Sequence, residues 1–250
     1  MISSRLADPG RLQNEEIDGF QARLLFTFWA GLNPLTANRE RSLRILIRNC
    51  GIELKFIELG ELRNWEIPSK PFHPGLKFLS PNHRSDYLRG YFMYHYGGAY
   101  VDLKPIKLRF GRFFRKLAQS RAEFCGSPEW FEDAVAGDSV MKSAYSEFAS
   151  NGIFIFKKMT PFAREWLTRS ERLLDYKYDS LVICHEKQFG RAELPLESSP
   201  HFDFLKTPPD YPLRWAELMG EIFHQLQWER KSSFILSLPP LYRIQKGNYR

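Results

Sequence analysis

The 250-residue sequence has no apolar run near the roughly 18–20 residues that a membrane-spanning helix needs. Its polar first segment, Met1–Gln21, lacks the apolar core of a secretory signal peptide. Cysteine is scarce: Cys50, Cys125 and Cys184 are 75 and 59 residues apart, which fits neither a zinc module nor a disulfide framework. We therefore expect a cytoplasmic protein without membrane spans, with three unpaired cysteines in its core.

Repeats and low-complexity tracts are also missing, and charged residues make up 26% of the chain. With 43% hydrophobic residues, this composition excludes long disorder and indicates one globular domain. Aromatic residues are abundant, at 15%, and can build a core or stack on bases and sugars.

The net charge of +7 is unevenly distributed. Residues 1–125 hold 20 Lys and Arg against 12 Asp and Glu, whereas residues 126–250 hold 16 against 17. A basic first half favours an anionic partner, such as a phosphate group, a nucleic acid or an acidic membrane face.

Hydrophobic patterning predicts an α/β fold. Arg23–Trp29 is typical of a strand buried on both faces, Thr36–Asn49 of a capped amphipathic helix, and Ile52–Leu59 of a second strand. A strand–helix–strand unit indicates a parallel sheet. Further strands are expected at Ala99–Leu103, Asn151–Lys157 and Phe234–Leu238. Further helices are expected at Asn82–Tyr96, Gly111–Arg121 and Tyr211–Trp228, and another that begins at Pro161. Loops are expected at Arg63–Pro81 and Leu173–Pro209.

One segment carries a functional pattern. Asp86 and Arg89 are three residues apart on a predicted helix and so share a face. Tyr100 and Asp102 alternate along the strand that follows and point to the same side. Asp102 stands where this strand ends, the usual place for a ligand in an open α/β sheet. We expect these four residues to form a site for anions and hydroxyls, the alternative for the first two being a simple intrahelical ion pair.

The segments SDYLR and YGGAYVD resemble the signature of family 32-like sugar transferases, in which an Asp-x-x-Arg helix and a Gly-Gly turn precede Tyr-x-Asp-x-Asp. The opening FTFWAG and the later YPLRWAELMGEIFH are similar to the same family, which includes capsular-polysaccharide and α-mannosyl transferases. The resemblance implies a GT-A-type fold, a Rossmann-like mixed sheet flanked by helices. It divides one domain, 1–250, into a polar extension (1–21), a nucleotide-sugar-binding half (22–125) and an acceptor-side half (126–250).

The implied activity is transfer of a hexose-type sugar from a UDP- or GDP-linked donor to a glycan or lipid-linked acceptor, with retention of anomeric configuration. The alternative is a degenerate module that binds a nucleotide or glycan without transfer. By resemblance, the donor base lies against Phe28, Trp29 and Ala30, and the donor sugar near Tyr100 and Asn151.

The same resemblance assigns the reacting centre. Asp86 is expected to bind donor-sugar hydroxyls, Arg89 to lie near the diphosphate, and Asp102 to be the first carboxylate of Asp-x-Asp. Asp102 and His224 would be ligands of a manganese or magnesium ion. The second Asp of the motif is replaced by Lys104. Either Lys104 neutralises the leaving diphosphate in place of a metal, or it points away and Asp102 holds the metal through waters.

An inverting enzyme would need a carboxylate base near the acceptor hydroxyl, and the sequence offers only Glu217 and Asp138 as polar candidates.

Residues 104–121 hold seven Lys and Arg, no acidic residue and three Phe. We favour a solvated basic helix face with a buried aromatic edge. A second interpretation is an interfacial helix that makes peripheral contact with anionic lipid. A nucleic-acid surface is third, and because no nucleic-acid-binding signature accompanies it, we expect no nucleic-acid partner.

Overall fold

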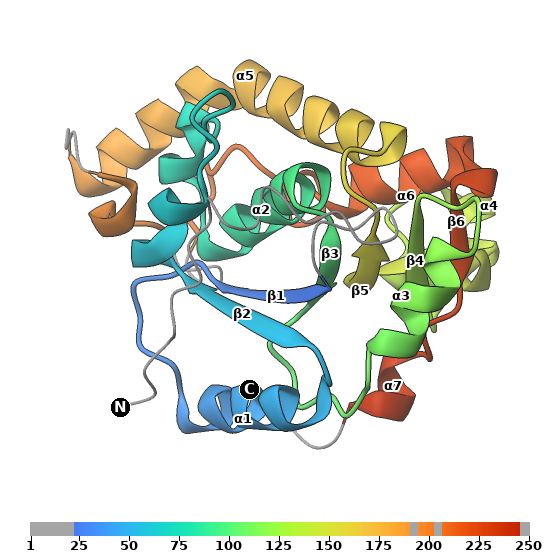
Figure 1. Cartoon of the computed structure of the whole chain (residues 1–250). Coiled ribbons are helices and arrows are strands. Elements are labelled where there is room, and N and C mark those ends of the chain that lie inside the picture. The colour runs from blue at the N-terminus through green and yellow to red at the C-terminus, as the bar shows by residue number, and fades with distance from the viewer. Residues whose placement is uncertain (1–22, 191–194, 203–206, 246–250) are drawn as a thin grey trace.

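The protein is described here by a computed structural model that covers residues 23–190, 195–202 and 207–245 (Figure 1). The predicted extension 1–21 lies outside these residues. Within them the chain forms a six-stranded sheet of order β2-β1-β3-β5-β4-β6. Its strands are β1 (Leu24–Trp29), β2 (Glu53–Glu58), β3 (Gly98–Val101), β4 (Phe124–Pro128), β5 (Ala149–Phe156) and β6 (Phe234–Leu236). Strand β5 runs antiparallel to both neighbours, and all other pairings are parallel.

Helices cover both faces of this mixed sheet, so the predicted α/β class is confirmed, and the arrangement is compatible with a Rossmann-like fold. One face carries α2 (Pro81–His95), α5 (Pro161–Phe189) and α6 (Gly220–Glu229), and the other carries α1 (Ala37–Asn49), α3 (Gly111–Ala118) and α7 (Leu241–Ile244) (Figure 1). The short α4 (Ser139–Ser143) lies between β4 and β5 in the chain. Short 3₁₀ segments occur at Leu59–Trp65, Pro74–Phe78, Glu132–Ala134, Tyr145–Glu147, Leu196–Ser198 and Lys231–Ser233.

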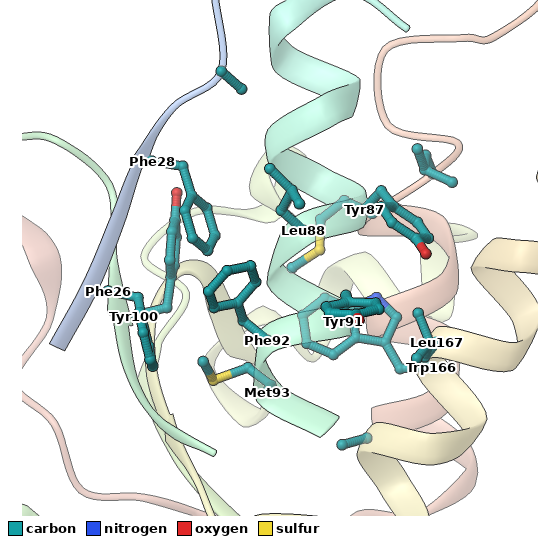
Figure 2. Packing of buried hydrophobic residues seen from close by; sticks show 14 of the residues in the cluster. Phe26, Phe28, Tyr87, Leu88, Tyr91, Phe92, Met93, Tyr100, Trp166 and Leu167 are labelled. Carbon is teal, nitrogen blue, oxygen red and sulfur yellow. The ribbon is translucent and has the colours of Figure 1, made fainter. Parts of the chain in front are cut away.

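Alternation along the strands divides the core into two clusters. Phe26 and Phe28 of β1 face α2, whereas Leu25 packs with the cluster on the opposite face of the sheet. Helix α2 is buried nearly all round, because it lies between the sheet and Trp166 of α5 (Figure 2). Gly90 of α2 faces the Trp166 indole directly, since an added Cβ there would lie 3.5 Å from the ring, an ordinary van der Waals distance.

Local sequence sets the start of the main helices. The side chains of Thr36, Ser80 and Thr160 each accept a hydrogen bond from the backbone N–H three residues later. A proline follows Ser80 and Thr160 at the first helical position. The helix starts expected at Thr36 and Thr160 are confirmed, and α2 begins at Pro81, one residue before the predicted start.

The Gly-Gly turn between α2 and β3 requires glycine. Gly97 and Gly98 have φ angles of 65° and 88°, in the left-handed region. An added Cβ on Gly98 would lie 2.9 Å from the Leu24 carbonyl oxygen, because the turn presses β3 against β1. The turn thus fixes where β3 begins and therefore where Asp102 follows it.

Several sequence expectations were wrong. Leu173–Pro209 was expected to be loops, but α5 continues through Phe189, since Leu174, Leu181 and Cys184 form a buried helical stripe. The helix expected from Tyr211 begins only at Gly220, and turns precede it. Strand β4 was not predicted, because its sequence FCGSP is short and contains Gly and Pro.

The three cysteines are free and buried, as predicted. Among the helices that the structure describes, none is both long and apolar enough to cross a membrane.

Candidate functional site

The candidate site lies at the edge of the sheet where β3 and β4 end. Because β5 runs antiparallel between them, its first residues lie beside both of these ends. The Asp102 amide donates to the Gly152 carbonyl at 2.9 Å, and the Glu129 amide donates to the Phe148 carbonyl at 2.8 Å. The residues after β3 and after β4 are thereby held on either side of the start of β5.

Asp102 is the centre of a charged cluster that brings together the four residues singled out in the sequence. Its Oδ1 accepts a hydrogen bond from the Tyr100 hydroxyl at 3.0 Å and lies 3.3 Å from Arg89 Nη2. Its Oδ2 lies 2.9 Å from Lys104 Nζ. Burial favours the neutral acid, but the charges of Lys104 and Arg89 outweigh it and hold the pKa of Asp102 below its ordinary value. Asp102 is therefore an anion at neutral pH.

Arg89 links the two carboxylates of the cluster. Its Nη1 lies 3.4 Å from Asp86 Oδ1 and donates to the Asn151 carbonyl at 3.1 Å. The guanidinium also lies over the Tyr100 ring, 4.7 Å from its centroid. Burial disfavours the charge, yet Tyr100, Asp102 and Asp86 raise the pKa of Arg89 above its ordinary value. The cation is thus fixed in place and permanently charged.

Asp86 faces the same arginine from one turn earlier on α2, so the predicted pairing is confirmed. Its side chain is only 5% exposed, and Oδ2 accepts a hydrogen bond from Asn82 Nδ2 at 3.2 Å. Burial has the largest effect on the pKa of Asp86 and raises it. The Asp102 charge also raises this pKa and the Arg89 charge lowers it, so that the pKa is about 7. Asp86 therefore titrates near neutral pH.

Lys104 points toward Asp102 and not away from it. Of the two orientations considered for Lys104, the structure shows the inward one. The side chain is 17% exposed and lines a cleft of about 320 Å³. Gly152 lies close beside it, and an added Cβ there would crowd Asp102 Oδ2 at 3.0 Å. The result is an ammonium group at the wall of a cleft, held by a carboxylate that it shares with Arg89.

The cleft extends from the end of β3 to the end of β4. Asn151 and Gly152 of β5 line it beside Lys104, so the predicted Asn151 does face this space. On the β4 side the cleft is lined by Glu129, Trp130 and residues of the turn that follows them in the chain. A smaller cavity of about 200 Å³, near His73 and Lys77, contains none of the predicted site residues.

The residues expected to meet the donor base do not line the cleft. Phe28 is 6% exposed and stacks on the Tyr100 ring at 5.3 Å, so it belongs to the core. Ala30 is buried as well. The Trp29 indole donates to the Asn33 carbonyl at 2.6 Å, and the Arg39 guanidinium lies 5.8 Å from its ring centroid.

His224 contacts a different carboxylate from the predicted one. It is fully buried; its Nδ1 accepts a hydrogen bond from the Ala136 amide at 3.0 Å, and its Nε2 lies 3.7 Å from Glu129 Oε1. No contact joins His224 to Asp102 among the described residues, and these contain no group of three or more His, Cys, Asp or Glu that could hold a metal. Asp102, already paired with two cations, does not fit a site for a hard divalent ion, which needs several oxygen ligands.

The two carboxylates considered as bases have structural contacts instead. Glu217 accepts from the Arg214 amide at 2.9 Å and lies 3.7 Å from Lys177 Nζ. Asp138 caps α4 by accepting from the Met141 amide at 2.9 Å. Neither lines the cleft, whereas Glu129, which the sequence analysis missed, does. The only sequence signal for Glu129 is an acidic residue next to two aromatic residues, after a strand that was itself not predicted.

The basic segment 104–121 contains the helix α3, shorter than expected. Phe110, Phe113 and Phe114 are all buried, and Phe113 and Phe114 are on its inner side. This is the placement expected for a basic helix face with a buried aromatic edge.

Comparison with known proteins adds no relative: the sequence matches no protein-family model and no curated protein.

Proposed function

We propose that this protein is a GT-A-type glycosyltransferase, which moves a hexose-type sugar from a UDP- or GDP-linked donor to a glycan or lipid-linked acceptor with retention of configuration. The observation that carries the proposal is the group formed by Asp102, Arg89 and Lys104 at the end of β3, where Lys104 faces a cleft. The mixed sheet, with one reversed strand beside β3, is compatible with the GT-A fold that the sequence resemblance implies.

The chemistry of sugar transfer suits this group. The bond from the anomeric carbon to the diphosphate oxygen breaks, and its electron pair leaves with the diphosphate. The acceptor oxygen bonds to the anomeric carbon, and in same-face transfer its proton passes to the departing phosphate oxygen. Fixed cations at the leaving group lower the barrier because they stabilise the charge that develops there.

Lys104 supplies this cation in our proposal. In a metal-dependent transferase a divalent ion neutralises the diphosphate. Here the Lys104 ammonium forms an ion pair with the Asp102 carboxylate, and its charge faces the cleft. Arg89, behind it, stays ionised and keeps Asp102 in position. Nucleotide binding should therefore persist without a divalent metal.

The second candidate is a module that binds a nucleotide or glycan without transfer. It is favoured by one observation: both oxygens of Asp102 already have cationic partners, so neither is free to hold a metal.

A thermal-denaturation series with UDP, GDP and their sugar conjugates, with manganese and with chelator, tests the proposal. A ligand that binds only the folded state adds about 2.7 kcal/mol of stability at a hundredfold excess over its dissociation constant. Donor turnover is then followed as release of the nucleoside diphosphate. Binding with turnover supports the transferase, and binding without turnover supports the module. No shift with any nucleotide overturns the transferase and the nucleotide-binding form of the module.

A matched pair of lysine variants locates the binding. Lys104→Ala should abolish the nucleotide-induced shift. Lys231→Ala, which removes an exposed lysine paired with Glu147, should leave the shift unchanged.

A further inference from the structure

We infer that the β4 side of the cleft is a saccharide site, in which Glu129 accepts a hydrogen bond from a sugar hydroxyl while the ring lies against Trp130 and Trp215. This inference deepens the proposed function. Its identification of the saccharide as the acceptor of the transfer reaction rests on that proposed function. The saccharide site itself follows from the burial, contacts and charge of the residues that line the cleft.

Glu129 is a buried carboxylate without a hydrogen-bond donor. It directly follows β4, is 6% exposed and lines the cleft. No described residue donates a hydrogen bond to its side chain, and its nearest cationic or polar partner is His224, at 3.7 Å. Because Glu129 lines the cleft, its carboxylate oxygens keep their full capacity to accept hydrogen bonds from a molecule bound there. A ligand hydroxyl would supply the missing donor.

His224 orients this carboxylate from behind. Because the Ala136 amide donates to Nδ1, the ring proton is on Nε2, which faces Glu129 Oε1. The Nε2 atom has no hydrogen-bond partner within the described chain. The ring cannot turn away, since it is fully buried and packs edge-on against Phe148 at 5.6 Å. His224 is thus a positioning residue for Glu129.

Exposed aromatic side chains border the same cleft. Trp130 is 52% exposed, Phe131 44% and Trp215 53%, and all three line it. Tyr242, also 52% exposed, extends this surface 5.8 Å from the Trp130 ring. Large aromatic surface is normally buried, so its exposure around a cleft marks a binding surface. The apolar C–H face of a sugar ring can pack on such rings while its hydroxyls reach a carboxylate.

Charge distinguishes the two walls of the cleft. Lys104 is at the β3 wall, whereas Glu129 and Asp133 are at the β4 wall. A diphosphate is attracted to the first wall and repelled by the second. The chemistry that fits the β4 wall is an uncharged, hydroxyl-rich ring, which leaves the nucleotide at the β3 wall.

The test measures binding of methyl α- and β-glycosides of glucose, galactose, mannose and N-acetylglucosamine to the full chain, through tryptophan fluorescence. At least one glycoside should change the emission saturably. Glu129→Gln should weaken that glycoside about tenfold or more, the loss expected for a hydrogen bond to a charged group. Trp130→Ala should abolish most of the emission change. The controls Glu147→Gln and Tyr176→Ala, which alter exposed residues elsewhere, should bind as the wild type does.

The positioning role of His224 has its own readout. His224→Gln should weaken glycoside binding while the shift caused by UDP or GDP stays at the wild-type value. A residue that only supports the core would lower the thermal midpoint and both affinities together.

Two results would overturn the inference: no glycoside binds, or Glu129→Gln keeps the wild-type affinity. Nucleotide shifts, measured on the same variants, separate this outcome from failure of the proposed function. If glycosides bind through Glu129 and no nucleotide binds, the transferase proposal fails and the saccharide site stands. If nucleotides bind and Glu129→Gln keeps the wild-type glycoside affinity, the saccharide site fails and the transferase proposal stands.

Discussion

The two walls of the cleft differ in how their charged side chains are paired. At the end of β3 the anions Asp86 and Asp102 are matched by the cations Arg89 and Lys104, all held by mutual contacts. At the end of β4, Glu129 is more buried than Asp102 but has no hydrogen-bond donor among the described residues. The charges at the β3 wall pair with one another, whereas Glu129 at the β4 wall keeps a carboxylate that, in our inference, a ligand hydroxyl bonds. Mutations at the first wall should lower activity and, where they remove the shared cation Arg89, stability as well, whereas mutations at the second wall should mainly affect binding.

The largest effect on stability is expected for Arg89→Ala. This substitution leaves the carboxylates of Asp86 and Asp102 without their shared cation. Removal of one partner from such a buried ion pair typically lowers the free energy of unfolding by about 3–5 kcal/mol. Urea unfolding measures it. The control Arg44→Ala removes an exposed pair with Glu40 and should cost at most about 0.5 kcal/mol. Equal losses in the two variants would contradict the view that the β3 wall is a structural charge group.

Asp102→Asn should separate activity from folding at the same wall. The amide keeps the shape of the side chain but no longer holds Lys104 toward the cleft. We expect donor turnover to fall by about 100-fold or more, the size typical for loss of one preorganised electrostatic contact. Asp175→Asn, at a 75% exposed site, is the matched control. Full activity in Asp102→Asn would remove Asp102 from the site.

A smaller effect is the pH dependence caused by Asp86. Because its pKa is about 7 in the folded protein, above the ordinary 3.8, the folded state keeps a proton that the unfolded chain has lost. The stability from this proton is fully present below about pH 4 and is lost as the pH rises through 7. Between pH 5 and 8, wild-type unfolding free energy should therefore fall by about 2 kcal/mol more than that of Asp86→Asn. Parallel pH profiles in urea unfolding would show that Asp86 does not titrate in this range.

The β3 wall could be predicted because its geometry is local. The contact of Asp86 with Arg89 follows from a three-residue spacing on one helix, and that of Tyr100 with Asp102 from alternation after a turn that requires glycine. Even the approach of Lys104 to Asp102 spans only two residues. Spacing could not decide whether Lys104 turns inward, because that depends on the packing around it.

The β4 wall could not be predicted, because it brings together residues far apart in the chain. Glu129 and His224 meet only when α6 packs beside β5, and β4 itself has a sequence without strand character. Phe28 shows the opposite error: a residue assigned to a ligand by resemblance belongs to the core, where it stacks on Tyr100 and meets Phe92 edge-on. A resemblance transfers the position of a residue, while packing decides what its side chain contacts.

The most direct test of the central claim, that Lys104 takes the place of a divalent cation, is nucleotide affinity with and without metal in wild type and Lys104→Asp. This substitution restores the second carboxylate of the Asp-x-Asp pattern beside Asp102. We predict that the wild type binds UDP or GDP equally well in manganese and in chelator. Lys104→Asp should lose binding in chelator and regain it with manganese. A wild type that needs manganese, or a variant that binds as well as the wild type in chelator, would contradict the claim.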